Sequence, residues 1–500
     1  MKRLLCCLLA SFATFIPQMS RGASVVTNWA GSTAGYTQRD PGGAAGPSGI
    51  FEVANSDISY YTKAGILVWT TNQQGFFPPT SAGDCKAVYD VISQRFFAAA
   101  IGTGGTQIVV AVSRNSNPAT SGTNDWRFYT FAAGTGIDYP GIGIDAQALY
   151  VSYSGGAPKF WMVMNKTNLL SGLTNAATAK VVTNMPTAPY SFNFGLQAVS
   201  VVGATSPGDI AYCVTRDTVS NTVSLFAITN VLGNRVFFQT NLPAPPVGTN
   251  NGIRAPQLAT ANRLITGTAA AMGNAFWREG ELWFCEAVGS TNQQERSVIR
   301  YYKIKTGGFP NGQATLDEAG DLDGGTNTWR LHPSIAGNPR GDVCLVFSQS
   351  SSNSFVSMQS AIRKVGQTTF DTVVVKTSST NWQANNSWSD FSVVTPDPND
   401  QTFWASHLII NGNNPASVNI WWGNIARENL FFVDKNAVGT ELGTRELPYH
   451  TVRNAHTAVT GAKTLVIKPA SYPEPTLPLR LDKNVRLENP YSSGIVHIGP

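Results

Sequence analysis

Short strand-like segments recur along most of this chain, and this recurrence constrains the fold more than any other feature. From about residue 48 to residue 427, runs of β-branched and aromatic residues alternate with Gly, Asn, Asp, Ser and Pro. Clear examples are the segments 65–70, 95–100, 107–113, 148–153, 280–285, 298–304 and 342–347. No convincing amphipathic helix interrupts them. The pattern predicts an all-β protein made of many short antiparallel strands.

The length of this strand-rich region selects among all-β architectures. About 400 residues are too many for one sandwich, whereas a propeller removes sheet edges by repeating four-stranded blades around an axis. At roughly 50–60 residues per blade, about seven blades fit, although the spacing alone does not fix the number. We therefore expect a β-propeller of about seven blades over residues 23–428.

The composition agrees with strands joined by polar turns. Charged residues make up 13% of the chain, about half the usual quarter, and 47 of 500 residues are Gly. A helical protein would be richer in Glu, Lys, Ala and Leu. The net charge of +5 is spread along the chain without a Lys or Arg cluster, so nucleic acid is not an expected partner.

The N-terminus has the organisation of a secretory signal peptide. Lys2 and Arg3 precede an apolar run that ends at Ile16, and small residues follow at Ser20 and Gly22. We expect cleavage after Gly22, so that residues 1–22 are the signal peptide. The apolar run is shorter than the roughly 20 residues that span a bilayer, and no later segment is long and apolar enough. The mature protein is therefore expected to be secreted or held at the cell surface.

Cysteine use leaves two interpretations open. Four cysteines follow the signal peptide, and four allow three disulfide pairings. Three of them lie inside strand-like runs, as buried thiols do, whereas export favours one disulfide. The four are Cys85, Cys213, Cys285 and Cys344. Since no Cys-x-x-Cys spacing occurs, a zinc site is not indicated.

Several short motifs follow one another in a recognisable order. They include Tyr89-Asp90 with Gln94-Arg95-Phe96-Phe97, Asp138-Tyr-Pro-Gly-Ile-Gly143, His332-Pro-Ser-Ile335 and Ser387-Trp-Ser-Asp-Phe-Ser392. In this order they resemble the Tyr-Asp…Arg-Trp and Trp-Gly-Asp-Tyr-Ser blade motifs of a family of secreted bacterial β-propellers of poorly known function. Phe97 replaces the usual Trp and Ser389 the usual Gly. The resemblance implies a propeller over residues 48–427 and supplies no catalytic residue.

The last 70 or so residues differ from the rest. Val452, Ala455 and Val459 form one apolar helical face, and the strand-like segments 465–467 and 485–487 follow. Residues 429–500 resemble the opening of a pectin-lyase-type right-handed parallel β-helix, in which a capping helix precedes the first rungs. We expect a short, incomplete β-helix-like segment of one or two rungs, packed as a small cap on the propeller or left by truncation of a longer relative.

Motifs for the common hydrolase mechanisms are absent from the sequence. The sialidase turn Ser-x-Asp-x-Gly-x-x-Trp, the Gly-x-Ser-x-Gly motif of serine hydrolases and a His-x-x-x-His metal pair do not occur. Asp397 with Asp400, or Glu279 with Glu281, could serve as a carboxylate pair for glycoside hydrolysis. For Asp397 and Asp400, a plain Asp-Pro turn is the favoured interpretation.

Two weaker sites remain as hypotheses. Trp382 and Trp388 flank a polar stretch, so their rings are expected on a loop where they could stack on a sugar. Asp321, Asp323 and Asn327 place side-chain oxygens in an acidic turn that could hold calcium, although a polar turn is favoured. No other cofactor is predicted.

The sequence favours an exported, non-catalytic propeller scaffold that binds extracellular carbohydrate or protein. The alternative is a polysaccharide-processing enzyme, either a glycoside hydrolase or a polysaccharide lyase. The two differ geometrically. An enzyme requires two carboxylates, or a carboxylate with Tyr or Arg, converging at the centre of the propeller, whereas a scaffold requires a mouth lined by Ser, Thr, Asn and backbone.

Overall fold

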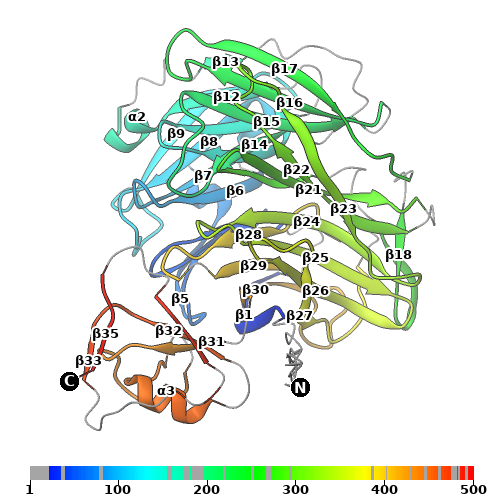
Figure 1. Ribbon diagram of the computed structural model, residues 1–500. Coiled ribbons are helices and arrows are strands. Elements are labelled where there is room, and N and C mark those ends of the chain that lie inside the picture. The colour runs from blue at the N-terminus through cyan, green and yellow to red at the C-terminus, as the bar shows by residue number, and fades with distance from the viewer. Residues whose placement is uncertain are drawn as a thin grey trace, which may run out of the picture.

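The chain is all-β, as predicted (Figure 1). The computed structural model describes residues 22–34, 40–77, 83–154, 160–173, 180–182, 195–217, 220–248, 253–265, 272–291, 296–384, 388–400, 402–427, 430–443, 447–459, 463–473, 481, 483, 485–489 and 494–499. The predicted signal peptide, except for Gly22, lies outside these residues. Among the described residues, no helix has the length and apolar character needed to cross a membrane.

Four consecutive strands form each of the first three antiparallel sheets. The first sheet contains β2 (Gly42–Ala45), β3 (Gly49–Val53), β4 (Asp57–Thr62) and β5 (Leu67–Asn72). The second contains β6 (Gly83–Asp90), β7 (Arg95–Ile101), β8 (Gln107–Ser113) and β9 (Trp126–Ala132). The third contains β10 (Asp138–Ile144), β11 (Ala148–Ser154), β12 (Phe160–Asn165) and β13 (Lys180–Val182).

Two further four-strand units are joined into one eight-stranded sheet, because their first strands, β14 and β20, pair in parallel. One unit contains β14 (Gln197–Val201), β15 (Ile210–Asp217), β16 (Thr222–Thr229) and β17 (Val236–Pro243). The other contains β20 (Met272–Arg278), β21 (Glu281–Gly289), β22 (Ser297–Lys305) and β23 (Thr315–Leu322). A hairpin of β18 (Arg254–Gln257) and β19 (Thr260–Ile265) lies between them in the sequence.

The last sheet of the ring joins the two ends of the strand-rich region. Before it comes a four-stranded sheet of β24 (Trp329–Gly337), β25 (Val343–Ser351), β26 (Ser354–Arg363) and β27 (Asp371–Thr377). The last sheet contains β28 (Val393–Pro396), β29 (Phe403–Ile409), β30 (Val418–Ala426) and β1 (Ser24–Ala34). β1 pairs antiparallel with β30, from Ser24 opposite Ala426 to Ala34 opposite Val418. An N-terminal strand thus completes a sheet otherwise built from residues 393–426.

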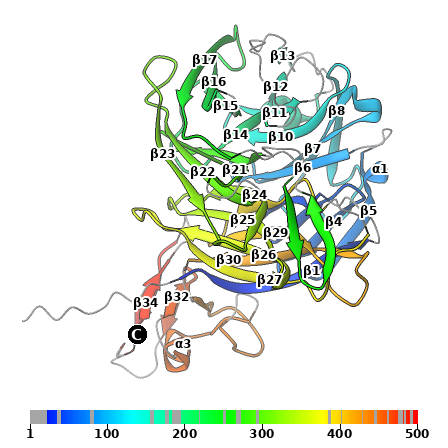
Figure 2. The ribbon, with the colours of Figure 1, turned by 90° about the vertical axis from the view of Figure 1, so that its right-hand side faces the viewer.

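The first strand of each unit contributes to a closed ring. In the described chain, β2, β6, β10, β14, β20, β24 and β28 (the inner strands) contact one another in that order, and β28 contacts β2 in turn. The remaining strands of each unit extend outward from this ring (Figures 1 and 2). The arrangement is propeller-like, and it removes free inner sheet edges by radial repetition.

The inner strands approach one another closely, which explains part of their sequence. A Cβ atom on Gly143 of β10 would lie 2.6 Å from the backbone oxygen of Val199 in β14, so only glycine fits there. Several inner strands also have an irregular register near their starts, including β6 at Asp84, β10 at Tyr139 and β24 at His332. These three residues have φ of 49°, 54° and 46°, values that residues other than glycine rarely adopt. The irregularities are bulges that redirect side chains at the start of the inner strands.

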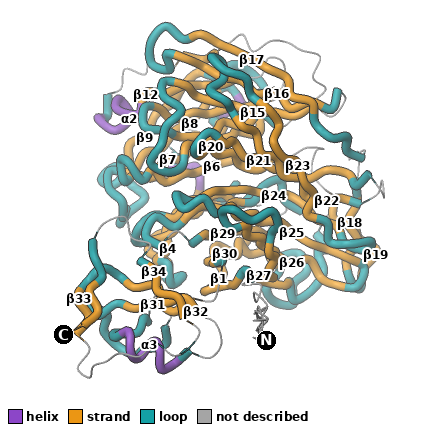
Figure 3. The backbone as a smooth tube through the Cα atoms, viewed as in Figure 1, coloured by secondary structure: helices purple, strands orange, loops and turns teal. Residues whose placement is uncertain are grey.

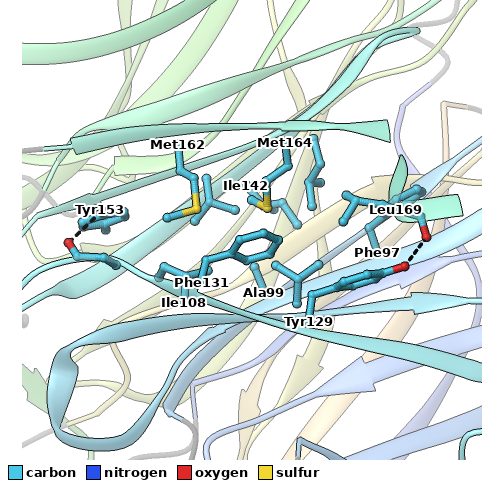
Figure 4. Packing of buried hydrophobic residues seen from close by; sticks show 14 of the residues in the cluster. Phe97, Ala99, Ile108, Tyr129, Phe131, Ile142, Tyr153, Met162, Met164 and Leu169 are labelled. Carbon is cyan, nitrogen blue, oxygen red and sulfur yellow. Dashed lines mark hydrogen bonds between the residues drawn. The ribbon is translucent and has the colours of Figure 1, made fainter. Parts of the chain in front are cut away.

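Apolar clusters fill the space between neighbouring sheets. Figure 4 shows the cluster between the second and third sheets, where Phe97 and Phe131 pack against Ile142, Met162 and Met164. Fully burying each such side chain stabilises the fold by about 1.5–3 kcal/mol. The four cysteines that follow residue 22 are buried, and none of them is joined in a disulfide, in agreement with one of the two sequence interpretations: Cys85, Cys213, Cys285 and Cys344.

Helix occurs in short pieces in the described chain (Figure 3). These are α1 (Gln73–Phe76), η1 (Thr103–Gly105), α2 (Lys166–Ser171) and α3 (Val452–Ala458). Thr451 caps α3 by accepting a 3.0 Å hydrogen bond from the backbone N–H of Asn454. As predicted, Val452, Ala455 and Val459 are all buried in one cluster.

The C-terminal strands pair in parallel, unlike the antiparallel strands within each unit of the ring. One parallel sheet has the order β31 (Leu430–Val433), β32 (Lys463–Ile467) and β34 (Val485–Glu488). A second pairs β33 (Ser471–Pro473) with β35 (His497–Gly499). Together with α3 these strands form a lobe beside the ring (Figure 1).

Candidate functional site

Four aspartates lie at the starts of four neighbouring inner strands. Asp40 precedes β2, Asp84 lies in the bulge of β6, Asp138 begins β10, and Asp390 lies just before β28. Because β28, β2, β6 and β10 are consecutive around the ring, residues far apart in the sequence meet at one end of its axis. Lys86 of β6 lies among them. We call these four aspartates and Lys86 the acidic site.

Hydrogen bonds connect the carboxyl groups of the acidic site. The side-chain nitrogen of Asn55 contacts Oδ2 of Asp40 at 2.5 Å and Oδ1 of Asp84 at 3.3 Å. The backbone N–H of Asp390 donates to Oδ1 of Asp40 at 2.7 Å. Asp138 is hydrogen-bonded to the carboxyl group of Asp84. The negative charge of Asp84 and its hydrogen bond favour the protonated form of Asp138.

The surroundings alter the acidity of these groups. Burial, and then the negative charge of Asp390, raise the pKa of Asp40 to about 7. Burial, and then the charge and hydrogen bond of Asp84, raise the pKa of Asp138 to about 6. The pKa of Asp390 is also raised, mainly by burial. Burial lowers the pKa of Lys86 to about 7, although three aspartates favour its charged form. The site therefore holds exchangeable protons near neutral pH.

Two aromatic residues contact members of the acidic site. The rings of Tyr139 and Phe391 are 4.4 Å apart between centroids, and both residues are buried. The ammonium nitrogen of Lys86 lies 3.0 Å from the centroid of the Phe391 ring, a cation–π contact. The hydroxyl of Tyr139 donates to the backbone oxygen of Asp390 at 3.0 Å. These contacts fix Lys86 and Asp390 relative to the carboxyl pair.

The chemistry of this arrangement is proton transfer. Because the pKa of Asp138 is raised to about 6, its carboxyl group can donate a proton near that pH and take one up again. Over the described residues, no cluster of three or more His, Cys, Asp or Glu side chains has a geometry that could hold a metal ion.

The opposite halves of the inner strands enclose a cavity of about 470 Å³. It is lined by residues later in the same strands, such as Ala87, Ile142, Ile335 and Val394. Ser200, Thr205, Ser206 and Asn274 also border it. The two ends of the axis thus differ: one gathers carboxyl groups and the other is mostly apolar.

The two predicted tryptophan ligands lie outside the helices and strands, as expected for a loop, but they are buried, so the expectation that their rings are exposed was wrong. Trp382 and Trp388 are 2% and 1% exposed. Their rings pack 5.9 Å apart between centroids. Gln257, from the β18–β19 hairpin, bonds the backbone N–H of Trp382 at 2.8 Å, and the indole N–H of Trp388 donates to Ser348 at 3.0 Å. The hairpin covers a segment that looks like an exposed loop in the sequence.

The two aspartates predicted as calcium ligands are paired with arginines instead. Both carboxylate oxygens of Asp321 accept hydrogen bonds from the guanidinium group of Arg300, at 2.6 and 2.8 Å. Asp323 forms an ion pair with Arg296, while Asn327 is exposed. Two arginine charges beside these carboxylates disfavour a divalent cation. These ion pairs favour the polar turn, the interpretation preferred from the sequence, over a calcium site.

The carboxylate pairs considered from the sequence have structural roles. Asp397 accepts from the backbone N–H of Asn399 at 2.9 Å, and Asp400 accepts from that of Thr402 at 3.0 Å, as the turn interpretation predicted. Glu279 pairs with the neighbouring Arg278 at 2.8 Å. Sequence reasoning missed all five members of the acidic site as site residues: Asp40, Asp84, Lys86, Asp138 and Asp390. Aligning the inner-strand segments with Asp138-Tyr-Pro-Gly would have shown that acids recur at their starts.

Comparison with known proteins assigns no family. No family model matches the chain, and no curated protein matches it. Solved structures that resemble it include a protein of unknown function from Dyadobacter fermentans, with a TM-score of 0.39, 10% identity, and coverage of 81% of this chain and 99% of that one. An endo-arabinase from Bacteroides thetaiotaomicron has a TM-score of 0.28 and 10% identity, over 58% of this chain and 92% of that one.

A third such structure is the catalytic domain of the GH62 α-L-arabinofuranosidase from Coprinopsis cinerea. Its TM-score is 0.31 and its identity 12%, over 66% of this chain and 98% of that one. At these scores, none of the three similarities carries an argument about the function of this chain.

Proposed function

We propose that the protein is an exported enzyme that cleaves glycosidic bonds at the acidic site. The observation that carries this proposal is the hydrogen-bonded pair of Asp84 and Asp138, in which the pKa of Asp138 is raised to about 6. Carboxyl groups converge there at one end of the ring's axis, which is the kind of arrangement that an acid–base enzyme requires. Glycoside hydrolysis requires only two carboxyl functions and water.

The proposed roles follow from protonation. Asp138, whose protonated form the neighbouring Asp84 favours, donates its proton to the oxygen of the scissile bond, and that bond breaks as positive charge develops on the sugar ring. Asp390 is the second carboxyl function, which stabilises this charge and accepts a proton from the attacking water. Asp40, which is 2% exposed, is too buried to contact a substrate and instead holds the backbone of Asp390.

A panel of neutral, amino and uronate oligosaccharides tests the proposal, with shorter products detected by chromatography. Cleavage of at least one substrate is expected. Its rate should fall above about pH 6, because the acid that donates the proton is then lost. Products whose rate is unchanged between pH 5 and 8 would contradict the assignment of Asp138.

A second candidate is the non-catalytic scaffold. The hydroxyl and amide groups of Ser200, Thr205, Ser206 and Asn274 around the cavity match the mouth expected of a carbohydrate or protein binder. Binding on a glycan array without any cleavage would favour this function over hydrolysis.

The finer organisation of the chain belongs to the same proposal. Each four-strand unit is one blade, which gives about seven blades over residues 23–428. Residues 429–500 are the opening of a pectin-lyase-like β-helix, supported by their parallel pairing and by α3. Residues 1–22 are removed on export, which N-terminal sequencing of secreted protein tests; an intact Met1 would oppose it.

A further inference from the structure

The cavity at the other end of the ring has the size and walls of a ligand site. Its volume of about 470 Å³ falls within the roughly 300–1,000 Å³ typical of small-molecule pockets. The side chains of Ile142, Ile144, Ile335 and Val394 form much of its wall. The cavity lies along later parts of the inner strands than the acidic site, so the two are distinct.

Small residues in the wall keep this space open. Gly337 and Ala336 of β24 and Ala87 of β6 line the cavity where larger side chains would fill it. A Cβ on Gly337 would lie 2.3 Å from the ring of Phe276, so the glycine allows that ring to lie against β24. Much of the wall is therefore apolar and lies on the inner strands.

The carboxylates that border the cavity are all bonded within the protein, two of them to lysines. Asp90 pairs with Lys166 at 2.9 Å, and Asp397 pairs with Lys63 at 2.8 Å. Asp145 accepts from the hydroxyl of Tyr150 at 2.6 Å and from the backbone N–H groups of residues 147 and 148. A charged ligand would lose its hydration there and would find these carboxylates already bonded by protein groups. The cavity thus selects for uncharged molecules.

We propose that this cavity binds an uncharged amphipathic small molecule, such as a long-chain alcohol, amide or ester. The apolar body lies against Ile142, Ile335 and Val394. The polar end lies near Ser200, Thr205 and Asn274, whose hydroxyl and amide groups can bond a neutral oxygen. This site is independent of the acidic site and of its proposed reaction.

The test is a fluorescence titration of the whole protein with N-phenyl-1-naphthylamine, a neutral apolar probe. We expect saturable binding of one probe per chain and displacement by dodecanol. Dodecanoate and dodecylammonium should displace it at least about tenfold less well, because their charges find no partner in the cavity. Equal displacement by all three compounds, or no saturable binding, would overturn the proposal.

Variants locate the binding. Val201→Trp, at a half-buried cavity residue, should weaken probe binding at least about tenfold by filling the space. Val374→Trp, at an exposed position of an outer strand, is the matched control and should bind as the wild type does. If Val201→Trp fails to fold, Ala336→Leu replaces it. Wild-type affinity in a folded cavity-filling variant would place the probe elsewhere and refute the site.

Discussion

Substitution of Lys63 by Met tests whether the ring depends on buried ion pairs between sheets. Lys63 lies in the turn between β4 and β5 and bonds Asp397, which follows β28, at 2.8 Å. The pair therefore links the first sheet of the ring to the last. The side chains are 8% and 0% exposed. Removing one partner from such a pair costs about 3–5 kcal/mol, since the other charge stays buried.

The lower end of that range applies here. Asp397 keeps two donors after the substitution, the indole N–H of Trp404 and the backbone N–H of Asn399, both at 2.9 Å. An unfolding entropy of about 2.1 cal/mol/K per residue over roughly 400 residues converts about 3 kcal/mol into a fall in Tm of about 3–4 °C. Adding Asp397→Asn should restore part of this loss, because the buried charge is then gone.

Differential scanning fluorimetry at neutral pH measures both effects. Lys305→Met is the control, because Lys305 forms a 2.6 Å ion pair with Asp317 but is 58% exposed. An exposed pair contributes less than about 1 kcal/mol, so this variant should melt within about 1 °C of the wild type. If Lys63→Met changes Tm no more than Lys305→Met, the reasoning about ring closure is wrong.

Three further predictions concern packing, protonation and the C-terminal lobe. Gly143→Ala should cost about 1–3 kcal/mol in a denaturant melt because its Cβ would meet the backbone of Val199, whereas Gly122→Ala, with its nearest neighbour 4.0 Å away, should be nearly neutral. Because the pKa of Asp40 is raised to about 7, its contribution to stability is present at low pH and is lost as pH rises toward 7. The free energy of unfolding of Asp40→Asn should therefore rise relative to that of the wild type by up to about 1.4 kcal/mol per pH unit between pH 4 and 7. A difference in Tm between the two proteins that stays constant over this pH range would contradict the prediction. Residues 429–500 expressed alone should be unfolded or aggregated, because β34 leaves a sheet edge open and few rungs are stacked; a cooperative melt of the fragment would contradict it.

Local patterns predicted the strands well but could not predict how the ring closes. The segments 95–101 and 148–154 are strands because their β-branched and aromatic residues need a pleated surface on which to pack. The pairing of β1 with β30 joins residues almost 400 positions apart, and nothing in residues 24–34 indicates that partner. Such non-local pairing is set by the whole fold.

The acidic site was missed for the same reason. Asp40, Asp84, Asp138 and Asp390 each stand alone in the sequence, and only the ring brings them together. For Trp382 the error was the opposite one, because a site residue was predicted where the structure has a buried side chain. Its polar neighbours indicate an exposed loop, yet a hairpin from residues 254–265 covers it. Sequence context describes neighbours along the chain, whereas burial depends on neighbours in space.

The rate of glycan cleavage by Asp138→Asn at pH 6 tests the central claim most directly. Loss of the Asp138 proton should lower the rate about 10²–10⁴-fold, as is typical when a general acid is removed. Glu279→Gln, at an exposed carboxylate away from the acidic site, should cleave at the wild-type rate. Both variants should melt within a few degrees of the wild type. A folded Asp138→Asn protein that cleaves as fast as the wild type would show that the acidic site does not carry out the reaction.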